Sequence, residues 1–270
     1  MVRLVEGDVP VSKADRNRQA AREKVAQMRA QAAQRRRRRI WTAGLAGVVL
    51  VSAAVIGITL GTGGGGGTSA NAGGTPKLKL APLSTLGAVR PAPAPGVVGP
   101  EGVPIPAAPA LASTSRGATG ANVDGIGCQT TEQSVFHIHA HLTVFVDGSP
   151  RQVPAAIGIP GAQAQTTPTG VFITGGTCLY WLHTHSADGI IHIESPVHRA
   201  YTLGQVFIEW GQPLGPDQVG PATGHVTALY NGQVYQGNPR DIPLNAHAQI
   251  QLEVGSPLIA PETIAFPAGL

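Results

Sequence analysis

Sulfur-containing and aromatic side chains are scarce in this chain of 270 residues, which has two cysteines and two methionines and is 4% aromatic. Both methionines, Met1 and Met28, lie near the N-terminus, so the rest of the chain offers no thioether, which argues against a Cu(I) carrier. Charged residues are also few, at 13%, whereas the chain contains 36 glycines and 23 prolines. That content is too high for a uniformly packed body, so we expect part of the chain to be a linker.

Acidic residues are scarce near the N-terminus, and basic residues are scarce elsewhere. Residues 1–39 contain 12 Lys and Arg against 4 Asp and Glu (net +8), and residues 40–270 contain 7 against 11 (net −4). The basic segment ends in the run Arg35–Arg39, which would attract phosphates. Residues 14–39 have a helical composition without an apolar stripe, so we expect this tail to set membrane topology, and we expect no nucleic-acid partner.

Residues 40–60 form a run of 21 residues without a charge. A helix of this length spans roughly 31 Å, enough to cross a lipid bilayer. Because the basic flank stays in the cytoplasm, we expect a single-pass cell-membrane protein with its N-terminus inside and its C-terminal domain outside. A cleaved signal peptide is the alternative, with residues 70–72 as a cleavage site, but the apolar region of such a peptide normally has about 7–15 residues.

The composition changes again after this run. Residues 61–121 are rich in Gly, Pro and Ala, which predicts a flexible spacer without a core of its own. We therefore divide the chain into a basic cytoplasmic tail (1–39), a transmembrane helix (40–60), a flexible linker (61–121) and an extracytoplasmic domain that contains all nine histidines (122–270).

The domain has the pattern of β-strands. Its short runs of Val, Ile, Phe and Tyr are separated by dipeptides that favour tight hairpin turns, Asp147-Gly148, Asp188-Gly189 and Asn231-Gly232. One helix is predicted over residues 203–210, where a capping box at Thr202 and Gln205 begins a run of apolar residues at helical spacing. The predicted fold class is mainly β, a sandwich or barrel-like domain with one short helix.

Cys128 and Cys178 are the only cysteines. An even number in an oxidising compartment favours a disulfide, which would hold the chain before His137 near the chain before His183. The alternative is a thiolate ligand of the blue-copper kind, with Cys178 close to His183. The domain has no methionine for the usual axial position of such a site.

Three histidines alternate with apolar residues between positions 135 and 146. The apolar residues of this predicted strand share one face: Phe136, Ile138, Ala140, Leu142, Val144 and Val146. His137, His139 and His141 therefore share the other face. Neighbours two positions apart lie about 7 Å apart, whereas His137 and His141 lie about 13 Å apart, so two of the three are expected to bind one ion.

A second segment contains three more histidines and a glutamate. If Asp188-Gly189 forms a two-residue turn, His185 lies opposite His192. The same register places His183 opposite Glu194. One face then presents three imidazoles and a carboxylate, a set that suits Zn²⁺, Cu²⁺ or Fe²⁺. Burying so many polar rings without a partner would be costly, so a metal ion or open solvent must satisfy them.

The two segments together predict one metal site. Its candidate ligands are His137, His139, His141, His183, His185, His192 and Glu194. Four of them are expected to bind the same ion, with His137 or His141 joining them: His139, His183, His185 and His192. Glu194 is expected either to bind the ion or to orient a ring. No catalytic residue is assigned.

Isolated histidines are more often surface residues than ligands, and we assign that role to His198, His225 and His247. Asp188 is explained by its position in the predicted turn.

The two histidine segments also carry a resemblance. The His-x-His-x-His motif at residues 137–141 is followed by Leu-His-Thr-His at 182–185 and by Asp-Gly-Ile-Ile-His-Ile-Glu-Ser-Pro at 188–196. In these motifs the chain resembles a group of membrane-anchored or secreted microbial domains. The resemblance covers about half of the chain and implies a recurring domain without implying an activity.

Three functions fit these patterns. The first is an extracytoplasmic protein that buffers, delivers or senses copper or zinc. The second is a metalloenzyme with a mononuclear site, either hydrolytic with Zn²⁺ or oxidative with copper or iron. The third is a module without metal in which clustered histidines form a pH-sensitive interaction surface. The sequence favours the first, with Cu²⁺ or Zn²⁺ as the ion and Fe²⁺ as a further possibility.

The predicted topology can be tested with a reporter fused after Leu270. We expect activity only from a reporter that functions outside the cytoplasm, because the basic flank precedes an apolar run of spanning length. Recovery of a soluble mature form that begins near Gly73 would contradict the uncleaved anchor.

Overall fold

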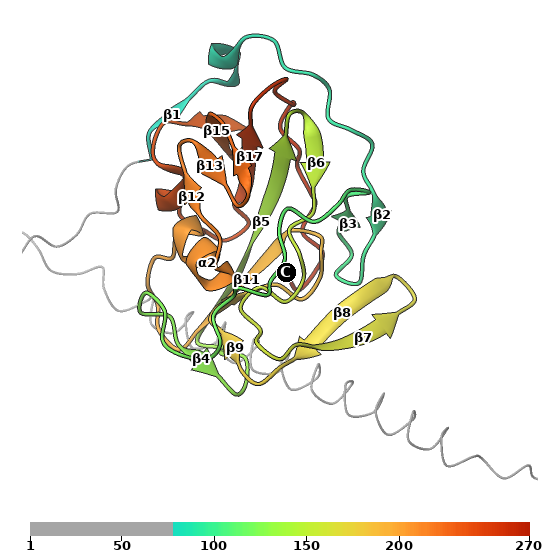
Figure 1. Cartoon of the computed structure of the whole chain (residues 1–270), viewed down its shortest axis with the longest axis vertical. Helices are drawn as coiled ribbons and strands as arrows, with labels where there is room; N and C mark the ends of the chain where they lie inside the picture. The colour runs from blue at the N-terminus through green and yellow to red at the C-terminus, as the bar shows by residue number, and fades with distance from the viewer. Residues whose placement is uncertain (1–77) are drawn as a thin grey trace, which may run out of the picture. The chain divides into compact units, whose positions relative to one another are not determined.

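The structure is a computed structural model, and it describes residues 78–270 (Figure 1). Among these residues no helix is long and apolar enough to span a membrane. The predicted tail (1–39) and transmembrane helix (40–60) lie outside the described residues.

An open sheet forms the centre of the domain. In spatial order its strands are β1 (Leu80–Ala81), β16 (Gln233–Tyr235), β15 (Val226–Tyr230), β17 (Gln249–Val254), β5 (Phe136–Val146), β11 (Ile190–Ser195) and β10 (Leu182–His183), and β6 (Ser149–Arg151) also pairs with β5. Neighbouring strands are antiparallel except β17 and β5, which are parallel.

Smaller elements surround this sheet. Three of them are two-stranded: β2 (Val97–Val98) with β3 (Pro104–Ile105), β4 (Cys128–Gln129) with β9 (Leu179–Tyr180), and β7 (Gln163–Thr167) with β8 (Gly170–Gly175). A three-stranded sheet contains β12 (Leu214–Gly215), β13 (Gln218–Val219) and β14 (Ala222–Thr223). The helical elements are α2 (Leu203–Trp210) and the 3-10 turns η1 (Leu83–Leu86) and η2 (Pro239–Asp241). The described part is thus mainly β with one α-helix, as predicted, and its open sheets are consistent with a sandwich-like domain rather than a closed barrel.

The core lies on one face of the central sheet, between the sheet and α2 (Figure 1). The alternation predicted for β5 is present, because Ala140, Leu142 and Val144 are buried in this core. Ile191 and Ile193 of β11 join them on the same face. The histidines of both strands must therefore face the opposite side of the sheet.

The predicted helix and two of the three predicted turns are confirmed. Helix α2 covers the predicted residues 203–210 and begins with the predicted capping box, in which the Thr202 N–H donates to Gln205 Oε1 at 3.1 Å. The turns at Asp147-Gly148 and Asn231-Gly232 are two-residue hairpins, and all four of these residues have positive φ, as type I′ turns require.

The predicted disulfide between Cys128 and Cys178 is present. It joins the start of β4 to the residue before β9, and these two strands also pair with each other. The thiolate alternative therefore does not hold, because among the described residues no cysteine is free.

The N-terminal arm, residues 78–121, differs from the predicted linker. Its backbone pairs with the domain at several points, including Leu80 with Tyr235 and Ala110 with Gln152. Some of its apolar side chains, such as Val103 and Leu111, are buried. A segment too poor in apolar residues to form its own core can still bury single side chains against the core of a neighbour, so the linker prediction is wrong for this part.

Glu209 is an unusual member of the core. It lies on α2 with an exposed fraction of 0%, and neither carboxylate oxygen has a hydrogen-bond partner among the described residues. Burial raises the pKa of Glu209 well above its usual range. The folded protein therefore retains a proton that the unfolded chain loses above about pH 4.5. The free energy of unfolding thus falls as pH rises from about 4.5 toward the pKa of Glu209 in the folded state.

Replacing Glu209 by Gln should remove this pH dependence. The free energy of unfolding of the variant, relative to the wild type, should rise by about 1.4 kcal/mol per pH unit above pH ~4.5, until the pKa of the folded state is reached. Denaturant unfolding between pH 4 and pH 8 measures it. The exposed Asp217→Asn variant serves as control. The prediction would be contradicted if the difference in unfolding free energy between Glu209→Gln and the wild type stayed constant with pH.

Candidate metal centre

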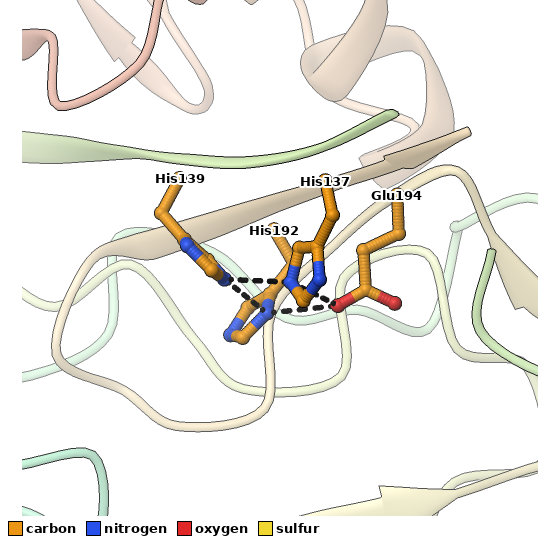
Figure 2. Close-up of side chains that lie close together, drawn as sticks. All are labelled: His137, His139, His192 and Glu194. Atoms are coloured by element: carbon orange, nitrogen blue, oxygen red, sulfur yellow. Dashed lines mark hydrogen bonds and ion pairs between the residues drawn. The ribbon is translucent and has the colours of Figure 1, made fainter. Parts of the chain in front are cut away.

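Two adjacent strands bring four donor side chains together on the face opposite the core. In the pairing of β5 with β11, His139 lies opposite His192, and His137 lies opposite Glu194. Opposed residues on an antiparallel pair have Cβ atoms about 4.5–5.5 Å apart, so all four side chains are within reach of one another. Figure 2 shows them converging, and we call this group the first donor set: His137, His139, His192 and Glu194.

The donor atoms of this set form a closed ring of short distances (Figure 2). His137 Nε2 lies 3.2 Å from His139 Nε2, which lies 3.1 Å from His192 Nδ1. Glu194 Oε1 completes the ring at 3.3 Å from His192 Nδ1 and 3.1 Å from His137 Nε2. Four ligands arranged tetrahedrally about Zn²⁺ at about 2.0–2.1 Å lie about 3.3–3.4 Å from one another. Neighbouring donor atoms of the ring thus have about the spacing of ligands around one ion, and all four donor atoms lie within 4.8 Å of one another.

The pairing of β10 with β11 differs from the prediction. His183 lies opposite His192, not opposite Glu194, and residues 184–189 form a longer connection instead of a two-residue turn. The reason is that Thr184 pairs with another segment: its N–H donates to the Ile157 carbonyl and its hydroxyl to the Pro154 carbonyl. The register that would have placed His185 opposite His192 is therefore wrong.

His183 and His185 nevertheless lie beside the first donor set, and their ring nitrogens face each other. His183 Nε2 lies 3.1 Å from His185 Nε2, and Glu132 Oε1 lies 3.5 Å from His185 Nε2. On these two distances we call these residues the second donor set: His183, His185 and Glu132. Glu132 has no pattern around it in the sequence that marks it as a ligand, and sequence reasoning missed it.

Backbone carbonyls determine which ring nitrogen of the second donor set carries the proton. His183 Nδ1 donates to the Tyr180 carbonyl at 2.7 Å, and His185 Nδ1 donates to the Ile173 carbonyl at 2.5 Å. A carbonyl oxygen can only accept, so each Nδ1 is protonated. In neutral rings both Nε2 atoms then present lone pairs to each other, an arrangement that a cation between them would satisfy.

Burial keeps most of these rings neutral. It lowers the pKa of His139 and that of His183 to about 3, with a further contribution from the neighbouring His192 in both cases. The pKa of His185 is lowered for the same two reasons. At neutral pH these imidazoles therefore offer lone pairs to an ion without first losing a proton.

His192 is the exception because two carboxylates contact it. Burial acts to lower its pKa, but hydrogen bonds to Glu101 and Glu194, and their charges, outweigh burial and raise the pKa to about 9. Burial acts to raise the pKa of Glu194, but hydrogen bonds from His137 and His192 hold it well below its usual range. At neutral pH, His192 is thus a cationic imidazolium between two carboxylates, Glu101 and Glu194.

Glu101 belongs to the N-terminal arm and was not predicted. Its Oε1 accepts from His192 Nε2 at 2.7 Å, and its side chain is only 5% exposed. A carboxylate that holds one imidazole N–H directs the other ring nitrogen toward a metal ion, and here that nitrogen is Nδ1, which faces the first donor set. The arm, which composition suggested was a spacer, therefore takes part in the site.

His141 is the predicted ligand that the structure does not bring to either set. It is buried, and its Nε2 donates to the Asp188 carbonyl at 2.8 Å, so this nitrogen is already used. Burial lowers its pKa to about 4. The three histidines predicted to lie at the surface are exposed and belong to neither set: His198, His225 and His247.

A cavity of about 790 Å³ lies between the N-terminal arm and the sheet. Its polar lining includes His141, Arg151 and Asp188. Among the described residues that line it, none belongs to either donor set.

No protein-family model, curated protein or solved structure matches the chain.

Glu101→Gln should lower the pKa of His192 by about one unit or more, because it removes a buried negative charge in contact with the ring. Titration of the His192 ring by NMR in the ion-free protein measures the change. Glu132→Gln is the matched control, since Glu132 contacts His185 and should leave His192 almost unaffected. An unchanged His192 pKa in Glu101→Gln would show that the contact is absent in solution.

Proposed function

We propose that this protein is a membrane-anchored, extracytoplasmic transition-metal-binding protein that buffers, delivers or senses copper or zinc. The observation that carries the proposal is the ring of four donor atoms in the first donor set, with neighbours 3.1–3.3 Å apart. Three imidazoles and one carboxylate at this spacing suit Zn²⁺ or Cu²⁺. Residues 40–60 would hold the domain at the membrane.

Binding is favoured over catalysis by the position of the large cavity. A metalloenzyme needs a substrate pocket that opens onto the ion. The 790 Å³ cavity is lined by none of the donor residues, so a substrate in it would be separated from the ion. The side chain of His137 is 42% exposed and offers an ion a direct route from solvent. Accessible ligands beside a separate pocket suit uptake and release.

The site also weighs against a purely pH-sensitive surface. Such a module needs histidines that change charge near neutral pH. The pKa values of His139 and His183 are about 3, and that of His192 is about 9, so all three lie well outside that range.

His139→Ala should lower the affinity of the full-length protein for Zn²⁺ and for Cu²⁺ by more than about 100-fold, beyond the effect usual for residues that only orient a ligand. Calorimetry on the detergent-purified chain measures it. His225→Ala is the matched control, because His225 is exposed and lies in neither set, and its affinity should equal that of the wild type. Equal affinities in both variants would overturn the proposed site.

A further inference from the structure

The histidine cluster contains more donors than one ion can bind. The first donor set alone supplies four ligand atoms, which is the usual number for Zn²⁺. His183 and His185 remain outside it, and their exposed fractions are 0% and 3%. Their Nδ1 atoms are occupied by carbonyls, which leaves two Nε2 atoms facing each other at 3.1 Å. A single ion in the first donor set leaves this pair without a partner.

Glu194 connects the two sets. Its Oε1 contacts His137 and His192 in the first donor set. Its Oε2 is buried and has no hydrogen-bond partner among the described residues. Glu194 also lies within ligand distance of His183 and Glu132, with donor atoms no more than 4.8 Å apart. The carboxylate therefore has one oxygen engaged on the side of the first set and one oxygen free.

We propose that the protein binds two transition-metal ions side by side, one in each donor set, with the Glu194 carboxylate bridging them. This inference rests on the proposed function. The first ion is bound by His137, His139, His192 and Glu194 Oε1 (Figure 2). The second is bound by His183, Glu132 and Glu194, whose donor atoms lie within 4.8 Å of one another, and by His185, whose Nε2 lies 3.1 Å from His183 Nε2. Ions bridged in this way lie about 3.5–4 Å apart.

The second ion would satisfy the two Nε2 atoms, whose lone pairs face each other, and Glu194 Oε2, which has no hydrogen-bond partner among the described residues. Buried polar atoms without partners are costly, so an ion that satisfies them is favoured. The second set also has an opening to solvent, because the side chain of Glu132 is 54% exposed.

The competing arrangement is one ion that uses His192 together with His183 and His185, since these three also lie within ligand distance of one another. It predicts one ion per chain and the loss of that ion when His183 and His185 are replaced. The arrangement with two ions predicts two equivalents in the wild type and one in the variant that lacks both His183 and His185. Stoichiometry therefore separates the two arrangements.

The experiment is equilibrium dialysis of the full-length protein against Zn²⁺, with bound metal measured by mass spectrometry. We expect two equivalents in the wild type, one in His183→Ala/His185→Ala and one in His137→Ala/His139→Ala. One equivalent in the wild type would overturn the second ion and leave the proposed function standing. No binding in the wild type would overturn both.

A second measurement needs no variant and so does not depend on the variants folding. With Cu²⁺, two bridged ions couple magnetically, so the electron paramagnetic resonance signal per bound ion should fall at least twofold between the first and second equivalents. A signal that grows in proportion to bound Cu²⁺ through two equivalents would overturn the bridge.

Two carboxylate variants test the bridge separately. Glu194→Gln should weaken both binding steps, because it removes a ligand from each ion. Glu132→Gln should weaken one step by about tenfold or more and leave the other within twofold of the wild type. If Glu194→Gln weakened only one step, Glu194 would belong to one ion and the bridging role would be wrong.

Discussion

The antiparallel register between β5 and β11 is the constraint on which the rest of the site depends. It sets Ala140 against Ile191 on the core face and His139 against His192 on the opposite face. A slip by one residue would move every one of these side chains to the wrong face of the sheet. The burial of the aliphatic residues thus fixes the spacing of the donor atoms, and the core that stabilises the fold also aligns the first donor set. Folding and assembly of this set are one event.

Local patterns in the sequence were sufficient to predict much of this arrangement. The period-two alternation in β5, the capping box of α2 and the cysteine pair are signals carried by a few neighbouring residues, and the structure contains each predicted feature. The position of β10 was predicted incorrectly because Thr184 pairs with residues near position 157, about 27 positions earlier. Glu101 was missed for a similar reason: its partner His192 is 91 positions away, and its proline-rich surroundings resemble a spacer. Contacts of this range leave no local pattern to read.

Three of the donor rings are held by groups outside the two donor sets. Backbone carbonyls at Tyr180 and Ile173 orient the two rings of the second donor set, and Glu101 orients His192. Phe172 of β8 also stacks on the His185 ring, with centroids 4.9 Å apart. Each of these three rings therefore has a fixed direction before any ion arrives, which reduces the ordering that binding requires. Without an ion, the folded protein still has an electrostatic cost, because the lone pairs of the donor nitrogens lie close together.

The N-terminal arm is fastened to the domain at successive points along its length, and this order has a mechanical consequence. From residue 78 onward the attachments are Leu80 to Tyr235, Arg90 to Ile259, and only then Glu101 to His192. Tension applied to the chain at residue 78 would load these attachments in series. The first two must therefore rupture before the force reaches the contact between Glu101 and His192. The arm thus bears a load applied at residue 78 before that load can disturb the donor atoms.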